Sequence, residues 1–144
     1  HKDTLALRIQ WAADQPKRSI NDINAYADAC AVSFSAGGDE AELQTMGSPG
    51  KPVVAWHWRA GTEAPFSVTA SGIGTAERSA DHQLQAHSRW SDEHWQVVFA
   101  GPLDSLSFSG ADGIPIAFAI WCGANSERAG LKAHSPGSCQ LTIK

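Results

Sequence analysis

The stretch from Ile114 to Lys132 combines residue types that could form a functional site. It begins with alternating large apolar side chains, and this period of two predicts a strand with one buried face. After a turn the chain becomes polar, and Glu127, Arg128 and Lys132 follow closely. A strand can hold such a charged group at its tip, but loops also collect charges for solubility. On the pattern alone, the second interpretation is favoured.

The chain has three cysteines, Cys30, Cys122 and Cys139, and their spacing does not form a metal-binding set. There is no C-x-x-C pair for zinc or an iron–sulfur cluster, and no C-x-x-C-H motif for covalent haem attachment. An exported protein could carry one disulfide and one free thiol, but the sequence cannot choose the pair. Cys30 alternatively fits a small buried residue in a strand. We expect at most one disulfide and an odd thiol count.

The length and the net charge of the chain argue against several classes of function. A chain of 144 residues is long enough for one domain with a substantial core, so residues 1–144 are predicted to form a single domain. The formal charge of −4 argues against a nucleic-acid-binding surface, which should be basic. The longest apolar run is far too short to span a bilayer, which predicts a soluble chain. A hydrolase is a weak hypothesis because there is no G-x-S-x-G motif or paired-carboxylate motif.

Short alternating segments separated by turn residues predict an all-β fold, an antiparallel β-sandwich. We expect no substantial amphipathic helix, an irregular stretch over residues 36–52 and turns over residues 62–79. His57 lies between Trp56 and Trp58, so on a strand it faces the side opposite to both tryptophans. Met46 is the only methionine, and a lone methionine usually fills a gap in a core. The expected strands cover residues 4–11, 28–35, 53–58, 83–90, 93–103, 114–121 and 138–144.

The segment FAIWCGANSERAGLK, residues 118–132, resembles the C-terminal signature of a known family. The family is the haem b-binding gamma subunit of type II dimethyl-sulfoxide-reductase-like molybdoenzymes. It includes subunits of ethylbenzene dehydrogenase, dimethyl sulfide dehydrogenase, chlorate reductase and selenate reductase. Its pattern is roughly F-A-hydrophobic-W-D-G-x-x-x-E-R-N-G-x-K. The chain departs from it at Cys122, where the pattern has Asp, and at Ala129, where it has Asn. The matching positions are Trp121, Gly123, Glu127, Arg128, Gly130 and Lys132.

The resemblance extends over nearly the whole chain, although only two motifs are specific. The second motif is a methionine–glycine pair in a loop followed by V-x-x-W-x-W-K-A-G. Here it corresponds to Met46 with Gly47, and then to residues 53–61. In the hairpin region, Gly101 replaces the family's arginine, which removes a possible propionate or partner contact.

The resemblance implies a non-covalently bound haem b held between loops and strand ends. Met46 and Lys132 would be the axial ligands of its iron, and Trp56, Trp121 and Arg128 would contact the cofactor. His57 is the main rival ligand, since histidine is the commonest haem ligand. For His57 we nevertheless favour a surface position on a polar strand face.

Within that assignment, Glu127 or Arg128 could orient the lysine loop as an outer contact. The alternative for this pair is a salt bridge that shapes the turn. Lysine ligation requires a neutral amine, which burial and the charge of the iron both favour.

Two strong protein ligands leave no open coordination position, which favours electron transfer over oxygen or peroxide chemistry. The resemblance therefore implies a non-enzymatic haem b electron-transfer protein or subunit, periplasmic or otherwise exported. Its partners would be molybdenum-enzyme catalytic and iron–sulfur subunits, or a c-type cytochrome. The alternative is a carbohydrate-binding β-sandwich module, because six tryptophans could stack on sugar rings.

Overall fold

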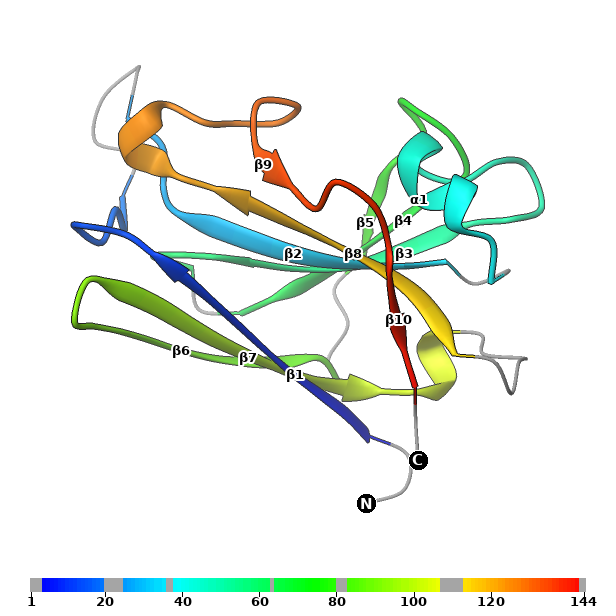
Figure 1. Ribbon diagram of the computed structural model, residues 1–144, viewed down its shortest axis with the longest axis horizontal. Helices are drawn as coiled ribbons and strands as arrows, with labels where there is room; N and C mark the ends of the chain where they lie inside the picture. Colours follow the sequence, from blue (N-terminus) through cyan, green and yellow to red (C-terminus); the bar gives the residue numbers. More distant parts are fainter. Residues whose placement is uncertain are drawn as a thin grey trace.

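The chain folds into two antiparallel β-sheets that face each other (Figure 1), as seen in a computed structural model. The structure describes residues 4–19, 25–35, 38–62, 64–79, 83–106 and 113–142. The all-β sandwich predicted from the alternating pattern is thus confirmed.

The smaller sheet has three strands in the order β1-β7-β6. They are β1 (Thr4–Ala12), β6 (Gln85–Ser91) and β7 (His94–Pro102). Strands β6 and β7 form the expected hairpin, and its bend contains Asp92 and Glu93, at φ angles of 51° and 59°. Positive φ at both central residues matches the right-handed twist of a two-residue hairpin.

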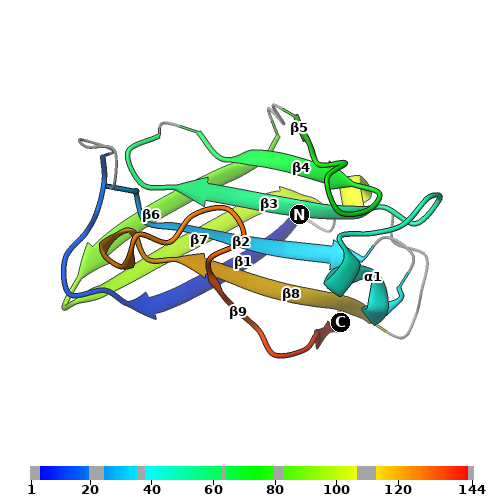
Figure 2. The same cartoon turned by 90° about the horizontal axis from the view of Figure 1, so that it is seen from above.

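The larger sheet runs in the order β10-β8-β2-β3-β4-β5, with β9 pairing on β8. Figure 2 shows β2, β3 and β8 side by side at its centre, and α1 over one end of them. Its strands are β2 (Ala29–Ser35), β3 (Val53–Arg59), β4 (Phe66–Ala70), β5 (Glu77–Ser79), β8 (Ile114–Trp121), β9 (Ala133–His134) and β10 (Cys139–Leu141).

Aromatic side chains fill the space between the sheets. Trp58 packs edge-on against Trp95 of the facing sheet, with ring centroids 4.9 Å apart, and Trp56 packs against Phe34 at the same distance. Each large aromatic side chain buries roughly 150–250 Å², so rings of this kind dominate the energetics of a core. Because strand side chains alternate, the outer face of the larger sheet is left to the residues between these aromatics.

A buried aspartate ties the start of β2 to three other segments. Asp28 is 1% exposed, and its Oδ1 accepts a hydrogen bond from the backbone N–H of Gly123 at 2.8 Å. Its Oδ2 accepts from the Lys17 backbone N–H and from the Trp95 indole, both at 2.8 Å. Charge-assisted bonds of this kind are stronger than neutral ones. They fix the point where β8 ends and the loop to Lys132 begins.

Three elements differ from the sequence-based expectation. The stretch 36–52 contains a short helix, α1 (Glu40–Thr45), capped by the Asp39 side chain, which accepts from the Ala41 N–H at 3.0 Å. The stretch expected to consist of turns, 62–79, contains β4 and β5. Two 3-10 turns, η1 (Asp104–Leu106) and η2 (Gly123–Asn125), complete the elements. Of the predicted closing strand 138–144, the structure has Cys139–Leu141, while residues 143 and 144 lie outside the described part.

The described residues contain no disulfide bond. Cys30, Cys122 and Cys139 are all free thiols. Cys30 is fully buried in β2, and this burial raises the pKa of its thiol well above the ordinary value. No helix in the described ranges has the length and apolar character needed to cross a membrane.

Candidate functional site

Met46 and Lys132, far apart in the sequence, line the same cavity on the outer face of the larger sheet. This Met–Lys cavity has a volume of about 540 Å³, within the range of about 300–1,000 Å³ typical of ligand sites. Met46 follows α1 on one side, and Lys132 precedes β9 on the other. In Figure 1 both elements lie on the side of the larger sheet that faces away from β1, β6 and β7.

The floor of the Met–Lys cavity is flat because β2 and β8 present small side chains there. Ala31 pairs with Ala119, and Ser33 pairs with Ala117, all four on the outer face. The residues between them, such as Val32, point into the core. Alternation of small and large residues is therefore what makes the two faces different. Larger side chains at these four positions would fill the cavity.

Met46 is held in an unusual backbone conformation. It has a φ of 59° and a ψ of 38°, and its backbone N–H donates to the Glu42 carbonyl, which ends α1. Its carbonyl accepts from the Gly72 N–H at 2.9 Å. For a residue other than glycine, the left-handed region costs about 1–2 kcal/mol. Strain of this kind that persists at a bulky residue points to a functional side chain.

The turn at Met46 also requires a glycine at position 47. Its φ is +85°, and a Cβ added there would lie 2.5 Å from the Ala70 carbonyl oxygen and 2.9 Å from that of Lys51. Only glycine fits such a close approach of three backbone segments. The methionine–glycine pair is thus a defined structural unit at the edge of the cavity.

The loop that carries Lys132 is pinned to the end of β8. The Trp121 indole donates to the Ala129 carbonyl at 3.0 Å, and the Leu131 N–H donates to the Arg128 carbonyl at 2.8 Å, closing a tight turn. Lys132 is half-buried, and its Nζ lies 5.3 Å from the centroid of the Trp121 ring. This contact places the amine at the rim of the Met–Lys cavity, against an aromatic face.

His57 lies between two aromatic rings on the cavity floor, which corrects the expectation of a polar strand face. Its imidazole stacks on Phe66 at 5.1 Å between centroids and lies 5.7 Å from Trp121. Burial, followed by the charges of Lys132 and Arg78, lowers the pKa of His57 to about 4. His57 does face away from Trp56 and Trp58, as predicted.

The lowered pKa of His57 has a consequence for stability. Between about pH 6.5 and pH 4 the unfolded chain binds a proton at His57 that the folded chain does not. Stability without ligand should therefore fall as the pH drops through this window, by at most about 3 kcal/mol from this residue. Urea unfolding of His57→Gln should show a shallower pH dependence. The same change at the exposed His87 on β6 should leave the slope unaltered, and equal slopes in both variants would refute the assignment.

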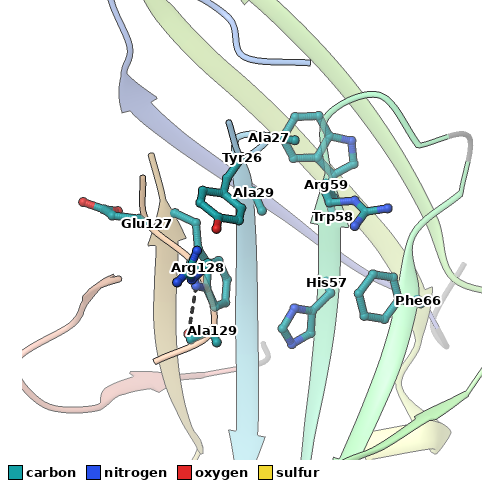
Figure 3. A pocket seen from close by; sticks show the side chains of 11 residues that line it. Tyr26, Ala27, Ala29, His57, Trp58, Arg59, Phe66, Glu127, Arg128 and Ala129 are labelled. Atoms are coloured by element: carbon teal, nitrogen blue, oxygen red, sulfur yellow. Dashed lines mark hydrogen bonds between the residues drawn. The ribbon is translucent and has the colours of Figure 1, made fainter. Parts of the chain in front are cut away.

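A second cavity adjoins the first and shares His57 and Trp121 with it (Figure 3). This arginine cavity has a volume of about 220 Å³ and carries Arg59 and Arg128 on its wall. The Arg128 guanidinium lies 4.8 Å from the centroid of the Tyr26 ring. Of the five residues predicted to contact a cofactor, Met46 and Lys132 therefore line the Met–Lys cavity, Trp121 lines both cavities, and Arg128 lines the second.

Trp56 is the predicted contact that the structure places elsewhere. It is 0% exposed, and its ring packs between Phe34 and Phe99 in the core, on the face of β3 opposite to the Met–Lys cavity, and it lines neither cavity. The expectation that it touches a cofactor is corrected to a core role. Gly101 lies on this inner side too, since a Cβ there would meet the Trp56 ring at 2.7 Å. A side chain at position 101 would therefore point into the core and not into either cavity.

Glu127 shapes the lysine loop through backbone hydrogen bonds. Its Oε2 accepts from the Cys122 N–H at 2.8 Å, and its Oε1 accepts from the Asn125 side chain at 3.4 Å. In the part of the chain that the structure describes, Lys51–Asp39 is the one ion pair, so Glu127 and Arg128 do not form the salt bridge considered above.

The two departures from the family pattern lie at conformationally demanding positions. Cys122 is the N-cap of η2 with extended backbone angles and no side-chain cap, a position where aspartate is among the preferred residues. Ala129 has a φ of 48°, and asparagine tolerates the left-handed region better than alanine. The usual family residues therefore match the local geometry better than those present.

Ala129→Asn should stabilise the protein by about 0.5–1 kcal/mol, because it relieves part of the left-handed strain at an exposed site. Urea unfolding at neutral pH measures this gain. Ala124→Asn, at an exposed residue of η2 without positive φ, should bring no gain. An equal or larger stabilisation from the control would exclude the backbone explanation.

The chemistry of the lining residues restricts what the site can hold. Among the described residues there is no group of three or more His, Cys, Asp or Glu side chains that could hold a metal ion. The Met–Lys cavity instead offers a thioether, an amine and a flat apolar floor. That set fits a flat apolar cofactor that brings its own metal, with the thioether and the amine as additional donors.

Comparison with known proteins finds three relatives that align with most of this chain. The chain is 34% identical over 134 residues to the chlorate reductase subunit gamma of Ideonella dechloratans, and 29% identical over 141 residues to the dimethylsulfide dehydrogenase subunit gamma of Rhodovulum sulfidophilum. A putative respiratory nitrate reductase heme subunit of Haloferax mediterranei is 30% identical over 139 residues. Each alignment covers 90–93% of this chain.

The chain is thus similar, over nearly its whole length, to two gamma subunits and one protein named as a heme subunit. The resemblance seen in its motifs is thereby confirmed. The chain spans about half the length of the curated relatives it matches, from 50% to 56%. No protein-family model matches the chain.

Several residues that line the two cavities were not predicted from the sequence. The floor residues Ala31, Ser33, Ala117 and Ala119 and the ring of Phe66 were not singled out as candidates, although they line the two cavities. The sequence did contain an indication of this floor. Small residues at every second position of two strands leave one face of the sheet free of large side chains, and a ligand can occupy that space.

Proposed function

We propose that the chain is a haem b-binding domain of an electron-transfer subunit, with Met46 and Lys132 as the axial ligands of the iron. The observation that carries this proposal is that both side chains line one cavity above a floor of small residues. The relative named as a heme subunit, and the two gamma subunits of reductase and dehydrogenase enzymes, support it.

Each lining residue has a defined task in this proposal. Met46 supplies a soft thioether, which favours the reduced metal. Lys132 supplies an amine that must be neutral to bind, so proton and metal compete for one lone pair. The four small floor residues would leave room for a ring between the two donors, and Trp121 and His57 would exclude water at its edge. Bound haem b supplies a one-electron couple at the iron.

With two protein ligands in place, the site has no position for a substrate at the metal, so we propose a role in electron transfer and none as a catalyst. The physiological partners would be the molybdenum-containing and iron–sulfur subunits of an oxidoreductase, or a c-type cytochrome. A periplasmic or otherwise exported location belongs to the same proposal. Fractionation of cells that express the full-length protein tests the location independently of haem binding.

The carbohydrate-binding alternative is not favoured. Four of the six tryptophans, Trp11, Trp56, Trp58 and Trp95, are at most 9% exposed and pack in the core, so they are not available to stack on sugar rings.

Titration of the purified chain with ferric haem b tests the proposal. We expect saturable binding of one haem per chain, a low-spin ferric spectrum, and sharp Soret and α bands on reduction. A protein that stays colourless after gel filtration and is retained on a polysaccharide column would contradict it and support the alternative.

A further inference from the structure

The two cavities are neighbours, and their far ends differ in charge. They meet at His57 and Trp121, which line both. At the α1 end, the wall of the Met–Lys cavity carries the carboxylate of Glu40, which accepts a hydrogen bond from Gln140 at 3.2 Å. At the other end, the arginine cavity carries Arg59 and Arg128. A ligand that spans the junction therefore meets an acidic end and a basic end.

The basic end contains more positive charge than its lining residues alone. The Arg78 guanidinium lies 3.7 Å from the centroid of the Phe66 ring, which also lines the arginine cavity. Lys132, on the other side of Trp121, adds no charge here once its amine binds the metal in the neutral form. This concentration is notable in a chain whose formal net charge is −4, because mixed charges would be expected on an ordinary surface.

These cations lack carboxylate partners among the described residues. Glu127 is the one acidic side chain that lines the arginine cavity, and both of its oxygens accept hydrogen bonds within its own turn. The single ion pair of the described chain, Lys51–Asp39, is formed by other residues. In Figure 3, Arg128 lies on one side of β2, and Arg59 extends from the end of β3 on the other side and points away from β2. Guanidinium groups arranged in this way can each bind a carboxylate.

We propose that Arg59 and Arg128 bind the two carboxylates of a haem whose ring lies in the Met–Lys cavity. This assignment rests on the proposed function. Haem b is a flat apolar ring with both carboxylates on one edge, so a basic cavity beside a flat apolar one matches it. The acidic Glu40 at the opposite end would repel that edge. The charges of the chain thus select one of the two ways in which the ring could enter.

Affinity for two porphyrins tests the assignment. The purified chain, freed of haem, is titrated with ferric protoporphyrin IX and with its dimethyl ester, each delivered from the same detergent-containing buffer, and the Soret absorbance gives the dissociation constants. Esterification removes both carboxylate charges and leaves the ring and the iron unchanged. In the wild type we expect the ester to bind about tenfold more weakly than the free acid, as for partly exposed ion pairs.

The double variant Arg59→Gln/Arg128→Gln should bind the free acid about tenfold more weakly, and the free acid and the ester with equal affinity within about twofold. Its matched control is Arg8→Gln/Arg89→Gln, which removes the same charge from exposed arginines of β1 and β6. The control should keep the wild-type preference for the free acid. The spectra report axial ligation separately and should stay low-spin in both variants.

Equal affinities of the wild type for the two porphyrins would overturn the assignment while leaving haem binding intact. A preference for the free acid that survives the double variant but changes with Glu40→Gln would place the carboxylates at the other end and would also overturn it. Absence of binding by either porphyrin would refute the proposed function itself. Thus the two failures are distinguishable.

Discussion

Replacement of Lys132 by alanine is expected to convert the haem-bound protein from a low-spin to a high-spin ferric spectrum at neutral pH and to weaken haem binding roughly 10- to 100-fold. The side chain lies at the rim of the Met–Lys cavity against Trp121, and no other described lysine lines that cavity. Its loss removes one of the two proposed donors. Lys132→His offers an imidazole in its place and could restore the low-spin form.

Acidification should have the same effect on the wild type, since a proton and the metal compete for the amine lone pair, whereas a thioether carries no competing proton. The amine is thus expected to leave before the thioether. Lys51→Ala is the control, since its ammonium pairs with Asp39 outside both cavities. A wild-type low-spin spectrum in Lys132→Ala would refute the lysine assignment.

Replacement of Met46 by leucine is expected to lower the reduction potential by on the order of 100 mV, a fraction of the roughly 0.8 V that axial ligands control. Leucine keeps a similar volume but has no sulfur, so the packing at the end of α1 changes little. Met46→Gly removes the side chain entirely and relieves the left-handed strain at φ 59°. That variant should remain folded and give the same shift, which separates loss of the ligand from loss of the fold.

Leu43→Ala provides the matched control for Met46, because Leu43 lines the same cavity from α1 and contains no sulfur. It should change haem affinity moderately and leave the potential within a few tens of mV of wild type, roughly, since the ligands are intact. Potentiometric titration followed at the α band measures all three variants. An unchanged potential in Met46→Leu would exclude the thioether as a ligand, and His57 would become the next candidate.

The strands could be predicted because their period-two pattern is carried by residues with clear preferences. Leu5, Leu7, Ile9 and Trp11 alternate on β1, and Trp95, Val97 and Phe99 alternate on β7, so the buried face is readable in each case. Strands β4 and β5 were not predicted, because they are short and turn residues flank them. The helix α1 was missed because six residues are too few for a helical period to be recognised.

The site could be predicted only in part, because pattern and motif identify residues but not the face on which they act. Trp56 and His57 are neighbours in sequence, yet the alternation of β3 sends Trp56 into the core and His57 to the cavity floor. That His57 is covered by rings follows from Phe66 on β4 and Trp121 on β8, two pairings that no local pattern reveals. The juxtaposition of Met46 and Lys132 likewise depends on tertiary structure.

X-ray absorption at the iron edge of the haem-bound protein tests the central claim most directly. The proposed ligands predict one sulfur in the first shell, with nitrogen for all other ligands. Met46 is the only methionine, so the sulfur signal should vanish in Met46→Leu and persist in Cys122→Ser, which alters the thiol nearest in sequence to the lysine loop. A first shell of nitrogen alone in the wild type, or a sulfur signal that survives in Met46→Leu, would contradict the account.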